Sequence, residues 1–105
     1  MPKKITEETR IKKEIKQYLL FSGWFIFPVL QGMGAYKGIS DFIAVKNGVV
    51  LFVEVKAPRG IQSNYQIEFQ RNIELSGGHY LVARGWQDVS DYIRQFPQSP
   101  MPGHS

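Results

Sequence analysis

The sequence predicts an α/β fold, a mixed β-sheet flanked by helices with the element order α-β-β-β-α-β-α. Asn47-Gly48 stands between two runs rich in β-branched residues, which is the strongest short-range signal for a β-hairpin. A helical segment then separates the hairpin from another apolar run, and this spacing favours a right-handed crossover to a parallel strand. Helices are therefore expected on both faces of one sheet.

Helical periodicity predicts the first element over residues 6–22. Thr6 is a suitable N-cap, and two acids follow it in the first turn, where the helix dipole favours negative charge. Gly23 ends the helix. Four residues recur at helical spacing and define a buried stripe: Ile11, Ile15, Tyr18 and Leu19.

Three strands follow this helix. Residues 24–30 are aromatic and β-branched, and Pro28 among them favours an edge position. Residues 31–38 contain three glycines and predict a loop. The hairpin spans residues 39–46 and 49–56, and its second strand is apolar on both faces, which is typical of a central strand.

The remaining elements are a helix, a strand and a helix. Ser63 and Gln66 have the spacing of a capping box, and the helix that they begin runs to about residue 76. Residues 79–83 predict a strand parallel to the one before it, and residues 86–96 a final amphipathic helix. Residues 1–96 are expected to form one domain, and residues 97–105, rich in Pro, Ser and Gly, a flexible tail.

Composition restricts the class of protein. The 105 residues suffice for one domain, 43% of them are hydrophobic, and there is no cysteine for a disulfide or a thiolate metal site. No apolar run approaches the roughly 20 residues that span a bilayer, and the N-terminus is polar and charged. A net charge of +4 permits an anionic partner without requiring one. We expect a cytoplasmic protein, bacterial or, if phage-encoded, in the host cytoplasm.

The hairpin register predicts a pair of opposed acids. If Asn47-Gly48 forms the loop, counting back along both strands brings Asp41 opposite Glu54 on one face of the sheet. Their Cβ atoms would lie about 4.5–5.5 Å apart, so the carboxylates would repel unless a cation lay between them. Lys56 follows Glu54 by two residues and shares its face.

These residues suit a hard divalent cation. Two carboxylates, with the backbone carbonyl of Val55 between the charged positions, are oxygen ligands of the kind that Mg²⁺ or Mn²⁺ takes. Lys56 beside the cation could orient or deprotonate a water, or neutralise charge on a phosphate. The alternative is a solvated cross-strand face, which leaves the unfavourable opposition of Asp41 and Glu54 unexplained.

The same residues resemble a known family of nucleases. Residues 38–41 (GISD), Glu54-Val55-Lys56 and Gln66 are similar to the motifs of the PD-(D/E)xK superfamily, and residues 56–60 (KAPRG) resemble its VRR-NUC group. The resemblance implies a restriction-endonuclease-like fold and metal-dependent cleavage of DNA, with Asp41 and Glu54 as metal ligands and Lys56 as catalytic lysine. Small stand-alone members act as homodimers on branched DNA, particularly four-way junctions. At the position before the first aspartate the family usually has proline, whereas this sequence has Ser40. A proline supplies no metal ligand, so the difference does not affect the expected metal site.

Two further positions correspond to family residues. Glu8 resembles the acid of the first helix, which could reach the metal, but it could equally be a solvated first-turn acid, with Glu7 or Glu14 as the counterpart. Gln66 matches the helix glutamine near the metal and the phosphate, and it also fits the capping box. Gln70, one turn later, is a weaker candidate.

Three cations flank the expected site, namely Lys37, Arg59 and Arg71. They are candidate phosphate contacts, which would give affinity without sequence preference, although each could be an ordinary surface charge. Together with the opposed acids, the resemblance to the VRR-NUC group implies a magnesium-dependent deoxyribonuclease that cuts branched DNA as a homodimer. The alternatives are a flap or end-processing nuclease, a general restriction-type nuclease, and a DNA-binding module that does not cleave.

Overall fold

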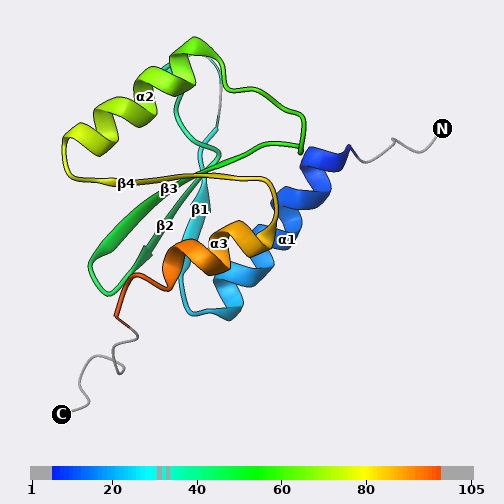
Figure 1. Ribbon diagram of the computed structural model, residues 1–105, viewed down its shortest axis with the longest axis vertical. Coiled ribbons are helices and arrows are strands. Elements are labelled where there is room, and N and C mark those ends of the chain that lie inside the picture. The colour runs from blue at the N-terminus through cyan, green and yellow to red at the C-terminus, as the bar shows by residue number, and fades with distance from the viewer. Residues whose placement is uncertain (1–5, 31, 33, 98–105) are drawn as a thin grey trace.

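The structure, a computed structural model, describes residues 6–30, 32 and 34–97 and has the predicted order of helices and strands (Figure 1). Gln31 and Met33 of the predicted loop, and residues 98–105 of the predicted tail, lie outside the described residues. No helix in the described part of the chain is long and apolar enough to cross a membrane. The elements are α1 (Glu7–Phe21), β1 (Phe25–Pro28), β2 (Phe42–Lys46), β3 (Val49–Val55), α2 (Asn64–Leu75), β4 (His79–Ala83) and α3 (Trp86–Ile93).

The four strands form one mixed sheet in the order β1-β2-β3-β4. β2 is antiparallel to both β1 and β3, and β3 is parallel to β4, so β3 is central and β1 is an edge strand, as predicted. The hairpin between β2 and β3 has the predicted register, with Lys46 paired with Val49. Asn47 and Gly48 both have positive φ, 51° and 81°, which is the backbone that a two-residue hairpin loop requires.

Three elements are shorter than predicted by three residues, each for a local reason. β1 covers Phe25–Pro28 rather than residues 24–30, because the N–H of Trp24 donates to the carbonyl of Leu19 in α1 (3.0 Å) and Pro28 has no N–H for the ladder. β2 begins at Phe42 rather than at residue 39. At that end of the strand pair, the Asp41 side chain accepts a hydrogen bond from the N–H of Val55 (2.7 Å), in place of a backbone carbonyl of β2. α3 ends at Ile93 rather than at residue 96, because the following N–H groups, of Gln95 and Phe96, donate to carbonyls three residues back (3.4 and 3.1 Å) and so tighten the turn.

The two faces of the sheet are covered differently. α1 and α3 lie on one side of β4 and α2 on the other (Figure 1). On the first face, α1 and α3 pack on a core that includes Leu51, Val53 and Val55 of β3. On the second, the Phe69 ring of α2 contacts the rings of Phe52 and Tyr80. Beyond α2 this face leaves large apolar side chains exposed: Phe25, Phe27 and Val50.

Candidate active site

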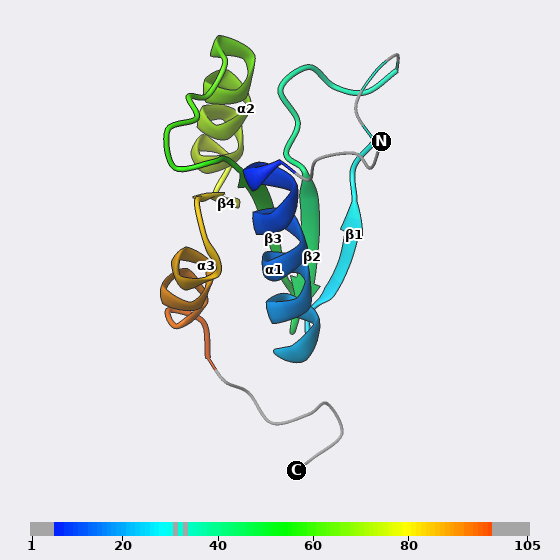
Figure 2. The same ribbon diagram turned by 90° about the vertical axis from the view of Figure 1, so that its right-hand side faces the viewer.

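The predicted acids meet at the end of the sheet opposite the hairpin turn. Phe42 pairs with Val53, and one further step in the same register brings Asp41 beside Glu54. Asp41 Oδ2 accepts the N–H of Val55 at 2.7 Å, which fixes that carboxylate against the β3 backbone. The N-terminal turns of α1 and the connection from β3 to α2 lie at the same end of the sheet (Figure 2).

Glu54 is a fully buried carboxylate with two unequal oxygens. Its Oε1 accepts a hydrogen bond from the Tyr80 hydroxyl and a longer one from Gln62 Nε2, at 3.4 Å. Its Oε2 is buried and has no hydrogen-bond partner among the described residues. The Lys56 ammonium lies 3.9 Å from that oxygen. Because a buried carboxylate oxygen that accepts no hydrogen bond is costly, Oε2 marks a place where a cation at closer range would be stabilising.

A lysine of α1 reaches the other acid. Lys12 Nζ lies 3.3 Å from Asp41 Oδ1 and 3.7 Å from Glu8 Oε2. Among the helix acids considered from the sequence, Glu8 is therefore linked to Asp41 through Lys12. Glu14 instead pairs with Arg10 at 3.2 Å, and Glu7 is exposed.

The donor set fits a hard divalent cation. Asp41 and Glu54 offer carboxylate oxygens, one of which is buried and accepts no hydrogen bond in the described structure. The ammonium groups of Lys12 and Lys56 lie beside the two acids, which shows that positive charge is favourable there. Carboxylate and carbonyl oxygens are the ligands that Mg²⁺ and Mn²⁺ prefer. Within the described residues, no group of three or more His, Cys, Asp or Glu side chains could hold a metal ion. The pair would need a backbone carbonyl or waters to complete a coordination shell.

The glutamines of this region have distinct positions. Gln66 forms the predicted capping box: its side chain accepts the N–H of Ser63 at 2.8 Å, and the Ser63 hydroxyl accepts the N–H of Gln66 at 3.2 Å. Gln62 is the glutamine that reaches Glu54, and its Nε2 also donates to Gln70 Oε1 at 3.0 Å. Gln70 is therefore connected to the acid indirectly.

Sequence reasoning missed three side chains of this site: Lys12, Gln62 and Tyr80. Tyr80 had a usable signal, because β4 was expected parallel to β3 and the two faces of β4 alternate. The register pairs Tyr80 with Phe52, so its side chain shares the face of Glu54. Burial, then the hydrogen bond to Glu54 and the negative charge of that carboxylate, raise the pKa of Tyr80 well above its usual value.

Two loops hold the site from either side. Arg84 Nη1 donates to the carbonyls of Ala57, Pro58 and Gly60 at 2.8, 3.2 and 2.8 Å, which fixes the turn that follows Lys56. Gly38, before Asp41, has φ +83°, and a Cβ atom there would collide with the backbone carbonyl of Tyr65 in α2.

Ser40, at the position where the resembled family has proline, lies directly before the first acid. It is fully buried, and its hydroxyl donates to the carbonyl of Phe42 at 3.0 Å. The serine therefore helps to shape the backbone at this point through a hydrogen bond, where a proline would act through its fixed φ angle.

The three predicted phosphate contacts lie on the surface. Lys37 Nζ lies 5.0 Å from the centroid of the Tyr65 ring, over the first turn of α2. Arg59 is exposed in the turn after Lys56, and Arg71 is exposed on α2. Their role in binding DNA stays a prediction.

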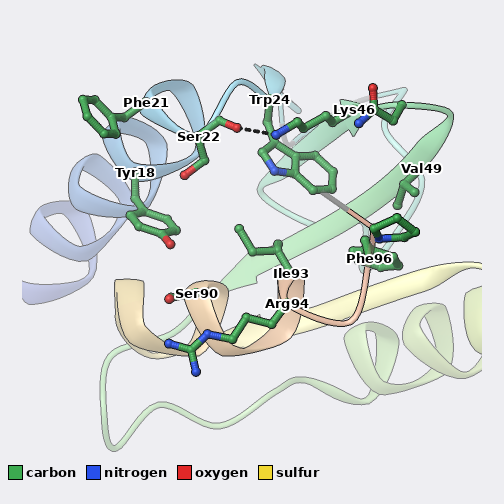
Figure 3. Close-up of a pocket in the computed structure, with 12 residues that line it drawn as sticks. Tyr18, Phe21, Ser22, Trp24, Lys46, Val49, Ser90, Ile93, Arg94 and Phe96 are labelled. Carbon is green, nitrogen blue, oxygen red and sulfur yellow. Dashed lines mark hydrogen bonds between the residues drawn. The ribbon is translucent and has the colours of Figure 1, made fainter. Parts of the chain in front are cut away.

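A hollow of about 570 Å³ lies at the opposite end of the sheet from the acids, between the end of α1, the hairpin turn and the end of α3 (Figure 3). Its two charged lining residues already have partners: Lys46 Nζ donates to the carbonyl of Ser22 at 2.7 Å, and Arg94 pairs with Asp91 at 3.6 Å. The hollow contains none of the predicted site residues.

Comparison with known proteins identifies the fold. No family model and no curated protein matches the sequence. A solved structure described as "VRR_NUC domain" superposes with a TM-score of 0.74 and 23% sequence identity, over 88% of this chain and 99% of that one. The chain has the fold of a VRR-NUC domain. The fold that the motifs predicted is thereby confirmed, and the acids Asp41 and Glu54 can be considered in the setting of a VRR-NUC fold.

Proposed function

We propose that this chain is a metal-dependent nuclease of the VRR-NUC group that hydrolyses phosphodiester bonds in DNA. The observation that supports it most is the buried Oε2 of Glu54, which accepts no hydrogen bond in the described structure and has the Lys56 ammonium 3.9 Å away. Asp41 lies beside Glu54, directly before β2, in a VRR-NUC fold. A purely structural role would leave this buried charge with one oxygen unsatisfied.

Each residue has a role in this proposal. Asp41, Glu54 and the carbonyl of Val55 would hold Mg²⁺ or Mn²⁺, with Glu8 as a possible outer contact. When bound, such an ion supplies Lewis acidity toward a phosphoryl oxygen. The Lys56 side chain is 16% exposed, and its ammonium, held beside Glu54, would orient the attacking water or neutralise charge that develops on the phosphate.

The start of α2 would contact the DNA backbone. The capping box of Ser63 and Gln66 orders a helix N-terminus at this end of the molecule, and free N–H groups there attract phosphate. Gln66 would lie near the scissile phosphate, and Lys37, Arg59 and Arg71 would contact neighbouring phosphates. Lys12 would exchange its contact with Asp41 for a phosphate oxygen when a metal ion occupies the site.

Branched DNA, in particular a four-way junction, is the proposed substrate, and a homodimer is the proposed active form. Two symmetric cuts require two sites, and one domain of this size offers one pair of acids. The exposed apolar side chains of Phe25, Phe27 and Val50 share one face of the sheet, which supports an interface between two copies.

Cleavage of a defined DNA panel tests the activity. Labelled four-way junction, flap, single strand and linear duplex would each be incubated with the protein and Mg²⁺, with EDTA as the control. We expect cutting of the junction that requires the metal and disappears in Asp41→Ala, while junction binding remains. Binding by the wild-type chain without any cutting would favour a non-cleaving DNA-binding module. If flaps are cut faster than the junction, the flap rather than the junction is the substrate.

Sedimentation velocity tests the homodimer. Phe25, 67% exposed on the open sheet face, would be replaced in Phe25→Glu, with Phe21→Glu on α1 (Phe21 is 93% exposed) as the matched control. We expect the first variant to be monomeric and the second to remain dimeric. A monomeric wild-type chain at all concentrations would exclude the proposed interface.

A further inference from the structure

We propose that Tyr80 is a positioning residue that turns the Glu54 carboxylate so that Oε2 faces the metal ion. This inference rests on the proposed function and adds a residue to its site. The Tyr80 hydroxyl donates to Glu54 Oε1, and Gln62 donates to the same oxygen at 3.4 Å. Both donors therefore engage one oxygen and leave the other, Oε2, without a hydrogen-bond partner in the described structure.

The position of the Tyr80 ring is itself determined by packing. β4 is parallel to β3, and Tyr80 pairs with Phe52, two residues before Glu54 on the same face. Tyr80 is 2% exposed, and the centroid of its ring lies 5.9 Å from that of Phe69 on α2. A ring held between the sheet and a helix can place its hydroxyl within a narrow range of positions, and so it can select one rotamer of the carboxylate.

The chemistry of the contact suits this role. A hydroxyl that donates to a carboxylate forms a charge-assisted hydrogen bond, which is stronger than a bond between neutral groups. Tyrosine also keeps its proton at neutral pH, so the donor is present throughout the range in which Glu54 would hold a cation. Residues that orient a metal ligand in this way contribute to metal affinity although they do not touch the metal.

Metal affinity of a variant that lacks only the hydroxyl tests the inference. Mn²⁺ binding to wild-type protein and Tyr80→Phe would be measured by electron paramagnetic resonance in the absence of DNA. We expect the dissociation constant to rise about tenfold or more. Tyr18→Phe is the matched control, because Tyr18 lies on α1, packs its ring against Trp86 and lines the hollow at the opposite end of the sheet from the acids. Its dissociation constant should equal that of the wild type.

The possible outcomes separate the inference from the proposed function. If wild-type protein binds Mn²⁺ and Tyr80→Phe binds it equally well, Tyr80 is not a positioning residue and the nuclease proposal stands. If wild-type protein binds no Mn²⁺, the proposed function itself fails. Circular dichroism would check that each variant is folded. Tyr80→4-fluorophenylalanine restores the volume of the hydroxyl without its proton, and it should show the same loss of affinity.

Discussion

The two faces of strand β3 differ in packing and in chemistry. Leu51, Val53 and Val55 point to the face covered by α1 and α3 and are almost wholly buried among apolar side chains. Phe52 and Glu54 point to the face of α2, and Lys56 continues that alternation just past the end of the strand. Helix α2 buries one residue, Phe69, whereas α1 on the other face buries three, namely Ile11, Ile15 and Leu19. The first face is closed and apolar, and the second is partly open and contains a charged site.

This difference separates the source of stability from the source of activity. The closed face buries apolar area, which is the dominant favourable contribution to folding. On the other face, Glu54 is buried at a cost that its two hydrogen bonds offset only on one oxygen. A site of this kind can remain because the core on the opposite face stabilises the fold. Substitutions on the two faces should therefore affect different measurements.

The largest effect is expected when the two lysines of the hairpin are compared. Lys56→Ala should reduce DNA cleavage by about 10²–10⁴-fold, because the ammonium beside Glu54 is lost from the reacting site. Lys46→Ala removes a hydrogen bond to the Ser22 carbonyl at the opposite end of the sheet and should lower stability by about 1 kcal/mol. Its cleavage rate should stay close to that of the wild type. If both variants lost cleavage equally, the separation of stability from activity between the two regions would be contradicted.

A matched pair of valines on β3 measures the contrast in stability. Val53 is fully buried in the core, and Val53→Ala should lower the free energy of unfolding by about 2 kcal/mol, through lost burial and a cavity. Val50 is 42% exposed on the open face, and Val50→Ala should cost less than about 1 kcal/mol. Urea denaturation of both variants provides the measurement. Similar values would mean that the open face is packed in solution, for example by a second copy.

The turn after Lys56 gives a smaller effect. Arg84→Ala removes hydrogen bonds to three carbonyls and should lower stability by about 1–2 kcal/mol. Hydrogen exchange should accelerate in residues 57–60. The control Arg94→Ala breaks an exposed pair with Asp91 and should be nearly neutral. Unchanged exchange in residues 57–60 would show that the turn is ordered without Arg84.

The smallest effect concerns alkaline pH. The pKa of Tyr80 is raised above its usual value of 10.0 by burial and by Glu54, so the folded chain keeps this proton when the unfolded chain releases it. The contribution of this bound proton to the stability of the fold is complete below pH 10. The free energy of unfolding should fall as the pH rises above 10. The fall should be shallower in Tyr80→Phe, as measured by urea denaturation from pH 8 to 11. Identical slopes would show that Tyr80 ionises freely in the folded state.

Local patterns in the sequence determined most of the fold. The hairpin turn at Asn47-Gly48 depends on the φ angles of those two residues, and the helix starts at Thr6 and Ser63 depend on hydrogen bonds within three residues. Because a hairpin loop fixes the pairing of both strands, the opposition of Asp41 and Glu54 could also be read from the sequence before any coordinates.

Only the tertiary structure decided how those acids are held. Tyr80 lies 26 residues from Glu54, Arg84 lies 27 residues from Ala57, and Lys12 reaches Asp41 from another element. Such contacts depend on the packing of helices and on side-chain rotamers, which short-range patterns do not encode. The hairpin turn thus determined which carboxylates meet, whereas the packing of α1, α2 and β4 around them decided which oxygen of Glu54 accepts no hydrogen bond and faces a cation.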